Sequence, residues 1–105
     1  MHTPQPNLLI IGGSGFVSGT LACRALAHGY RVWTVTRGQR PLPDGVIPLI
    51  ADRRNDDEFT QVIQDAGVRW NLAVDCIAFE AKDTQQDALI LRSLVDHLVF
   101  ISTDF

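Results

Sequence analysis

The sequence has few features that would let it bind nucleic acid, cross a membrane or hold a metal. Its net charge is −3 and its largest basic cluster is the pair Arg53 and Arg54, so the electrostatic footprint of a nucleic-acid-binding protein is missing. No apolar run approaches the length of a bilayer span, and residues 1–6 lack the basic and then apolar layout of a signal peptide. Cys23 and Cys76 have no metal-ligand spacing and are expected to be reduced core residues. We therefore expect a cytoplasmic protein without nucleic acid, membrane or metal as a partner.

What the sequence does contain is a regular alternation of strand and helix patterns. Its 105 residues, of which 46% are hydrophobic and 20% charged, suit one globular domain. The predicted strands are residues 8–11, 31–36, 46–51, 72–78 and 97–102. The predicted helices are residues 16–27, a second helix that Asn55 caps and Gly67 ends, and residues 83–96. The positions expected to be buried are Val17, Leu21, Ala22, Ala25 and Leu26 in the first helix, Phe59, Val62, Ile63 and Ala66 in the second, and Ala88, Leu91, Leu94 and Val95 in the third.

This order of elements predicts an α/β fold with a doubly wound parallel sheet. The simplest arrangement of the five strands is 3-2-1-4-5, with right-handed crossovers that place helices on both faces. The carboxyl ends of strands one and four then flank a crevice, which is where such sheets bind ligands. The residues that follow the strands are therefore the candidate site.

A glycine cluster directly after the first predicted strand is the most specific functional signal. Gly12, Gly13 and Gly15 lie between a strand and a helix, where backbone N–H groups and the helix N-terminus can bind a pyrophosphate. The third glycine of a regular fingerprint would fall at Ser18, whose small side chain still permits close packing of helix on strand. The pattern favours a phosphate-binding turn, and the alternative is a tight turn without a ligand.

The end of the second predicted strand bears on the choice of dinucleotide. An NAD site usually has an acidic residue about 20 positions after the glycines, whereas this chain has Thr36 and Arg37 there. A guanidinium suits a 2′-phosphate, so Arg37 favours NADP over NAD, unless it is only an exposed loop cation. Asp52 after the third strand either binds the adenine amino group or caps the next turn. Arg53 beside it is also assigned to the cofactor.

The fourth and fifth predicted strands end in further candidates. Cys76, Ile77 and Ala78 are expected to line the cofactor through backbone and small side chains. Asp75 lies in an apolar strand, where a carboxylate needs a partner, so we expect a satisfied structural residue. The hydroxyls of Ser102 and Thr103 either polarise a substrate oxygen or form an ordinary turn.

These segments together resemble the N-terminal Rossmann part of the extended short-chain dehydrogenase/reductases, the NAD-dependent epimerase/dehydratase family that acts largely on nucleotide sugars. The resemblance covers essentially the whole chain and is most specific at residues 11–17 and 100–104. It implies that Asp52 contacts the adenine and that Thr103 hydrogen-bonds the reacting oxygen, with Ser102 packed behind it. Asp104 matches the general acid of the dehydratases, but Phe105 stands where they have a glutamate. The residues that would surround the pyrophosphate are Gly12, Gly13, Ser14, Gly15, Phe16 and Val17.

The family's general base, a tyrosine with a lysine four positions later, has no counterpart in this chain. Tyr30 is followed four residues later by Thr34, and the one lysine is Lys82. We therefore expect residues 1–105 to be an incomplete, inactive fragment that stops before the catalytic helix and the substrate lobe. The parent would transfer a hydride at a nucleotide sugar or a related alcohol or carbonyl substrate. The alternatives are a non-catalytic redox sensor, an RNA-associated relative, or a small α/β protein whose glycines only form a turn.

Overall fold

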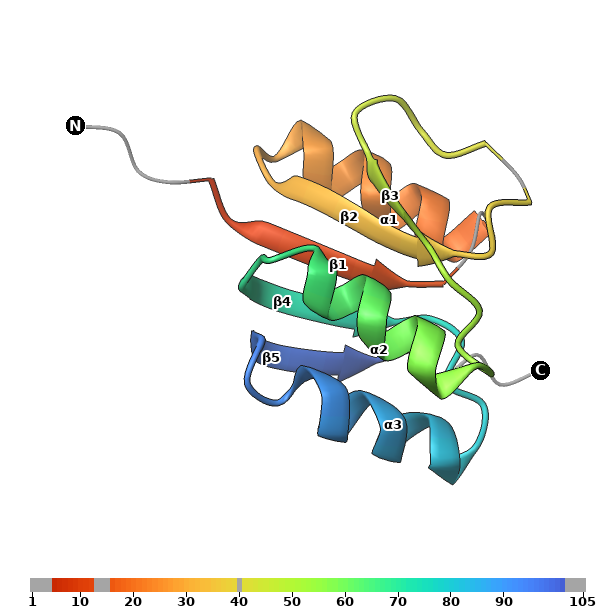
Figure 1. The fold of residues 1–105 in the computed structure, drawn as a ribbon. Coiled ribbons are helices and arrows are strands. Elements are labelled where there is room, and N and C mark those ends of the chain that lie inside the picture. The colour runs from red at the N-terminus through yellow and green to blue at the C-terminus, as the bar shows by residue number, and fades with distance from the viewer. Residues whose placement is uncertain (1–4, 13–15, 40, 102–105) are drawn as a thin grey trace.

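A five-stranded parallel sheet forms the centre of the molecule, with the predicted order β3-β2-β1-β4-β5 (Figure 1). A computed structural model describes residues 5–12, 16–39 and 41–101. Every neighbouring pair of strands is parallel. The strands are β1 (Asn7–Ile11), β2 (Arg31–Thr36), β3 (Ile47–Ile50), β4 (Trp70–Asp75) and β5 (Val95–Phe100), and the helices are α1 (Phe16–Ala27), α2 (Asp56–Asp65) and α3 (Ala81–Leu91). Within the described ranges, no helix is long and apolar enough to cross a bilayer.

The two faces of the sheet are covered by different helices. Leu9 and Ile11 of β1 belong to a core that includes Phe59 of α2 and Leu91 of α3. Leu8 and Ile10 pack on the opposite face against α1. Because successive residues of a strand point to opposite faces, the continuous apolar run of β1 is what burial on both sides requires. The crossover helices thus leave the carboxyl ends of β1 and β4 next to each other, as the predicted strand order requires.

The first helix begins and ends as predicted, but its buried face is shifted. Val17 was expected to face the core, yet it is 41% exposed, whereas Ser18 is buried. Ser18, Ala22 and Ala25 form the stripe that faces the sheet, since residues four and three apart share one side of a helix. These small side chains let α1 lie close to the strands.

The second helix confirms the predicted cap and stop. The side chain of Asn55 accepts the N–H of Glu58 at 3.1 Å, and Phe59 and Ile63 are buried. Val62 and Ala66 are half-buried and pack at the margin of the same core. Gly67 has a φ of +64°, a conformation that glycine adopts without strain, and the helix ends before it.

The predictions for the last helix and the two strands around it were partly wrong. The helix ends at Leu91, where the N–H of Leu94 bonds to the Leu91 carbonyl, so Val95 begins β5 instead of extending the helix. Ala88 is exposed, and Asp87 occupies the inward position four residues before Leu91. The fourth strand ends at Asp75 instead of residue 78, because the Asp75 carboxylate accepts the N–H of Ile77 and turns the chain.

Candidate functional site

The candidate site begins where β1 and β4 end side by side. The N–H of Cys76 donates to the carbonyl of Ile11 at 2.8 Å, and the N–H of Gly12 donates to the carbonyl of Val35 at 3.1 Å. A Cβ added to Gly12 would lie 3.0 Å from the Cβ of Cys76, which is tighter than nine in ten real Cβ contacts. Gly12 is therefore a glycine because the two backbones meet here, in the crevice that the strand order creates.

Several of the predicted site residues lie outside the described ranges. They are Gly13, Ser14, Gly15, Ser102, Thr103 and Asp104. Their assignment to the pyrophosphate or to a substrate oxygen stays a prediction. The structure does place what flanks the glycines, since β1 ends at Ile11, directly before Gly12, and α1 begins at Phe16. A twelve-residue helix therefore starts four residues after Gly12, and a helix N-terminus is a place that favours anions.

Arg37 lies at the carboxyl end of β2 in a turn with a defined geometry. The hydroxyl of Thr36 accepts the N–H of Gly38 at 3.0 Å. Gly38 has a φ of +77°, and a Cβ there would meet the side chain of Ile50 at 3.2 Å. Arg37 itself is exposed, and none of the described carboxylates forms an ion pair with it. The turn thus presents an uncompensated cation beside the crevice.

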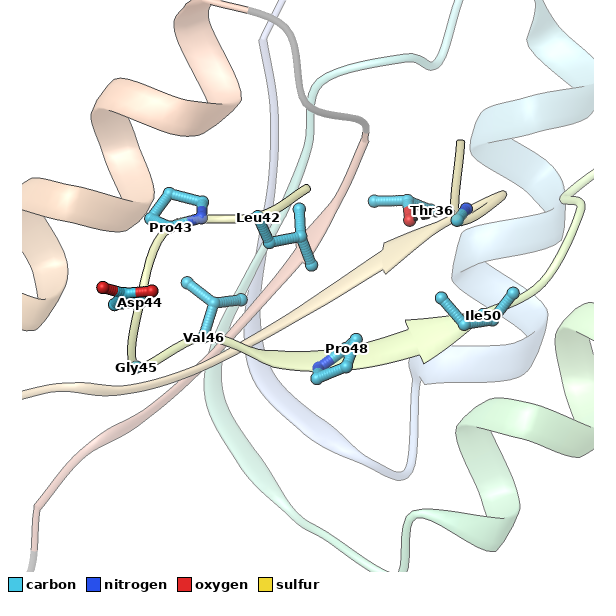
Figure 2. A pocket seen from close by; sticks show the side chains of 9 residues that line it. Thr36, Leu42, Pro43, Asp44, Gly45, Val46, Pro48 and Ile50 are labelled. Carbon is cyan, nitrogen blue, oxygen red and sulfur yellow. Dashed lines mark hydrogen bonds between the residues drawn. The ribbon is translucent and has the colours of Figure 1, made fainter. Parts of the chain in front are cut away.

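A hollow of about 370 Å³ lies next to Arg37, between the loop that carries Leu42 and Pro43 and the edge strand β3 (Figure 2). Thr36 and Gly38, on either side of Arg37, line one end of it. Its exposed lining is polar and apolar in about equal parts, and Asp44 is its one ionisable lining residue. Its one charged side chain is therefore a carboxylate, which would repel a pyrophosphate, and Gly12 is not among its lining residues.

Asp52 caps the turn after β3, which is one of the two roles expected for it. Its Oδ1 accepts the N–H of Arg54 at 2.9 Å. The side chain is half-buried, between β3 and the start of α2. A contact of Asp52 with the adenine stays a prediction.

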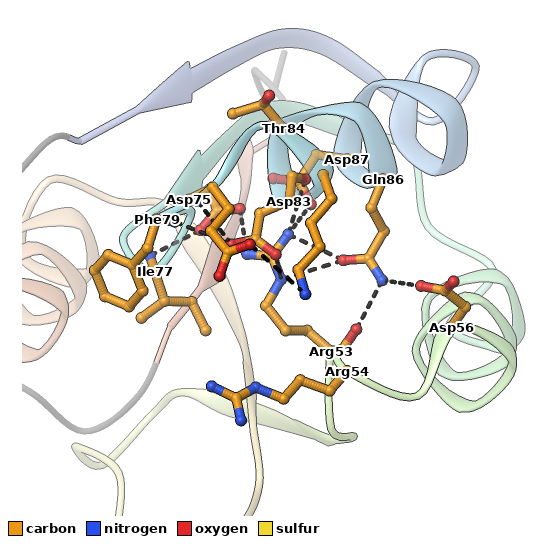
Figure 3. Close-up of polar contacts among 12 residues, drawn as sticks. Arg53, Arg54, Asp56, Asp75, Ile77, Phe79, Asp83, Thr84, Gln86 and Asp87 are labelled. Carbon is orange, nitrogen blue, oxygen red and sulfur yellow. Dashed lines mark hydrogen bonds and ion pairs between the residues drawn. The ribbon is translucent and has the colours of Figure 1, made fainter.

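Arg53 is the centre of a buried polar network that joins three parts of the chain (Figure 3). Its Nη1 lies 2.6 Å from Oδ2 of Asp75, at the end of β4, and its Nη2 lies 2.8 Å from Oδ1 of Asp87, in α3. Gln86 accepts from Nε and Nη2 at 3.1 and 3.0 Å, and the carbonyl of Asp83 accepts from Nη2 at 3.0 Å. The guanidinium also lies 5.5 Å from the ring centre of Phe59. The predicted partner of Asp75 is therefore confirmed, and it is Arg53.

The Arg53 guanidinium is consequently not free to bind a ligand. Its side chain is 8% exposed, and five hydrogen bonds from its three nitrogens go to residues of β4 and α3. The assignment of Arg53 to the cofactor stays a prediction. Because the guanidinium is engaged, such a contact would have to come from the backbone of Arg53. What the side chain does is hold the turn that carries Asp52.

Two groups beside the crevice have raised pKa values. Burial, with a smaller contribution from Asp75, raises the pKa of the Cys76 thiol to about 11. Cys76 is therefore a neutral thiol near pH 7 and not a nucleophile. Burial raises the pKa of Asp87 to about 9, and the hydrogen bond and charge of Asp75 act in the same direction while Arg53 opposes them.

Asp83, Gln86 and Asp87 were not predicted as partners of Arg53. A signal was present, because Asp83, Asp87 and Leu91 are spaced four residues apart and so share one face of a helix. An apolar strand that contains Asp75 and a helix face that contains two aspartates require a buried cation. Arg53 would have been a candidate for that cation.

Comparison with known proteins supports the fold. No protein-family model and no curated protein matches the sequence. Solved structures do match, and they include short-chain dehydrogenase/reductases and epimerase/dehydratase proteins. The chain thus has the Rossmann-type fold of these proteins, as the strand order predicted.

Three of these structures show how far the likeness extends. A proposed NAD-dependent epimerase/dehydratase from Methylobacillus flagellatus superimposes with a TM-score of 0.73 at 24% identity, over 94% of this chain and 37% of that one. A proposed short-chain dehydrogenase/reductase from Burkholderia multivorans with bound NADP superimposes with a TM-score of 0.72 at 17% identity, over 95% of this chain and 59% of that one. A short chain dehydrogenase family protein from Francisella tularensis superimposes with a TM-score of 0.73 at 13% identity, over 96% of this chain and 52% of that one. This chain therefore spans between about a third and three fifths of the length of these proteins.

Proposed function

We propose that this chain binds NADP across the carboxyl ends of β1 and β4, as the cofactor-binding part of an oxidoreductase. The observation that carries the proposal is the close approach of Gly12 to Cys76, which places the start of the glycine turn in the crevice between these strands. A side chain at position 12 would crowd Cys76, so the turn starts with a glycine, and a glycine-rich turn before a helix N-terminus is a common phosphate-binding site. The turn would hold the pyrophosphate with Gly12, Gly13, Ser14, Gly15, Phe16 and Val17.

The remaining contacts follow from the neighbouring strand ends. Arg37 would bind the 2′-phosphate, since it is an exposed guanidinium without an ion-pair partner among the described residues. Asp52, whose Oδ1 caps the turn after β3, would bind the adenine amino group through its carboxylate, and Cys76, Ile77 and Ala78 would line the other side. NAD is the alternative cofactor.

The bound nicotinamide would supply hydride transfer to or from a substrate carbon. Thr103 would hold the reacting oxygen, with Ser102 and Asp104 as auxiliary groups. A nucleotide sugar, or a related alcohol or carbonyl compound, is the substrate class we propose for the parent protein. Because residues 1–105 contain no Tyr-x-x-x-Lys pair, we expect no catalytic turnover from this part of the protein alone.

A non-catalytic dinucleotide sensor is the second candidate, and the same missing pair favours it. The two functions differ in a simple assay. Hydride transfer to any nucleotide sugar by the parent protein supports the enzyme, whereas dinucleotide binding without turnover supports the sensor.

Calorimetric titration with NADP and NAD tests the cofactor proposal, with Arg37→Gln as the informative variant. Each hydrogen bond to a charged group contributes about 1.5–3 kcal/mol, so we expect NADP affinity to fall roughly tenfold to a hundredfold while NAD affinity stays unchanged. Arg31→Gln is the matched control, because Arg31 lies at the opposite end of β2, over the Trp33 ring. Equal losses for both dinucleotides would contradict the role of Arg37, and no binding by the wild type would contradict the proposal itself.

A further inference from the structure

The network around Arg53 contains more buried negative charge than positive charge. Asp75 and Asp87 both have side chains with no exposed surface, and each is paired with the same guanidinium. Asp83 adds a third carboxylate, 3.8 Å from Nε and 18% exposed. If Asp75 and Asp87 were both ionised, one buried charge would remain uncompensated, and buried charges without a partner are strongly unfavourable.

The hydrogen bonds point to the same conclusion. Oδ1 of Asp87 accepts from Arg53, but its Oδ2 is buried and has no donor among the described residues. Asp75 and Asp87 bind neighbouring nitrogens of the same guanidinium, Nη1 and Nη2, so their carboxyl groups lie side by side. Carboxylate groups only accept, so a hydrogen bond between two carboxyl groups needs a proton on one of them.

We propose that Asp87 is un-ionised and donates its proton to Asp75, and that the resulting clasp of Arg53, Asp75 and Asp87 positions the backbone beside the crevice. The proton belongs on Asp87, because Asp75 already accepts from Arg53 at 2.6 Å and from the N–H of Ile77 at 2.8 Å. The clasp is then neutral overall. Its role toward the cofactor rests on the proposed function.

The clasp ties together the segments that would contact a dinucleotide. Asp75 holds the start of the segment 76–78 through the N–H of Ile77. Arg53 holds the turn that contains Asp52, and Gln86 of α3 donates to the carbonyl of Arg53 at 2.7 Å. Loss of the clasp would therefore displace the backbone on the β4 side of the crevice without removing a residue that touches the ligand.

The shared proton makes stability depend on pH in a defined direction. Burial raises the pKa of Asp87 from its ordinary value of 3.8 to about 9. Between these values the folded chain holds a proton that the unfolded chain has released, so stability falls as pH rises through this window. Among the residues that the structure describes, the charged groups that face Asp87 or its partners are Arg53, Asp75 and Asp83, with Asp56 linked through Gln86. Arg53 opposes the shift, whereas Asp75 reinforces it.

Infrared spectroscopy of the chain without cofactor tests the proton directly. At neutral pH we expect the C=O stretch of an un-ionised carboxylic acid in the wild type and in the control Asp83→Asn, and its loss in Asp87→Asn. The wild-type unfolding constant should rise by up to tenfold per pH unit in the window in which the protonation states differ, and this contribution should vanish in Asp87→Asn. An absent acid signal in the wild type, or an unchanged pH dependence in Asp87→Asn, would overturn the shared proton.

Dinucleotide titration separates the clasp from the proposed function. We expect Asp87→Asn, which keeps a donor toward Asp75, to bind NADP like the wild type at pH 7. We expect Asp87→Leu, which removes both hydrogen bonds, to bind it several-fold more weakly. Equal binding by both variants would overturn the positioning role. If the wild type binds no dinucleotide, the proposed function and this positioning role both fail, whereas the infrared and pH results still decide the shared proton.

Discussion

Arg37 and Arg53 both lie at the carboxyl ends of the strands, but one is exposed and the other is buried. Arg37 directly follows β2, is exposed and has no ion pair with a described carboxylate. Arg53 follows β3, is 8% exposed and contacts two buried aspartates. A strand-end arginine is therefore a ligand-binding candidate only when the fold leaves its charge uncompensated. Helix α3 makes the difference, because it brings Asp87 and Gln86 to Arg53, whereas none of the described carboxylates forms an ion pair with Arg37.

Removal of the Arg53 side chain should have the largest effect of the changes that test this comparison. Arg53→Met leaves two aspartates without their cation, and breaking a buried ion pair by removing one partner costs about 3–5 kcal/mol. The measurement is the free energy of unfolding from denaturant titration. Arg54→Met is the matched control, since Arg54 is exposed and a change there should stay within about 0.5 kcal/mol.

A second substitution covers the case in which Arg53→Met does not fold. Arg53→Lys keeps one positive charge but cannot donate to Asp75, Asp87 and Gln86 in the same planar geometry. We expect Arg53→Lys to lower the free energy of unfolding by less than Arg53→Met does. Equal stabilities of the wild type and Arg53→Lys would show that a point charge is sufficient, and would contradict the structural role given to the guanidinium.

Gly12 tests how rigid the β4 side of the crevice is. In Gly12→Ala the new Cβ would lie 3.0 Å from that of Cys76, and overpacking typically costs about 1–3 kcal/mol. Gly19→Ala is the control, because Gly19 lies in α1 and a Cβ added there would have nothing within 4 Å, and helical Gly→Ala changes stabilise by roughly 0.5–1 kcal/mol. Opposite signs for these two changes, in thermal or denaturant unfolding, are the expected result. A neutral Gly12→Ala would mean that the β4 end moves freely, which the clasp is expected to prevent.

The same two arginines show how much could be predicted from the sequence. The strand order, the extent of α1 and the cap at Asn55 follow from local patterns, and the structure confirms them. The partner of Asp75 is 22 residues away in the chain, and that of Arg53 in α3 is 34 away, so only the fold brings them together. The burial of Asp87 in place of Ala88 was missed for a different reason, because hydrophobic periodicity gives an aspartate no weight.

The smallest expected effect concerns the cap beneath the Arg53 turn. Asn55→Ala removes the acceptor for the N–H of Glu58, and loss of such a cap costs typically about 1 kcal/mol. Gln64→Ala, an exposed change in the same helix, is the control and should stay within about 0.5 kcal/mol. Since the N–H of Asn55 bonds to the carbonyl of Asp52, the cap and the clasp hold one turn. A double-mutant cycle of Asn55→Ala with Arg53→Lys should therefore show a coupling energy above about 0.5 kcal/mol. Additive losses of unfolding free energy would mean that Arg53 orders α3 and β4 but not the turn in which it lies.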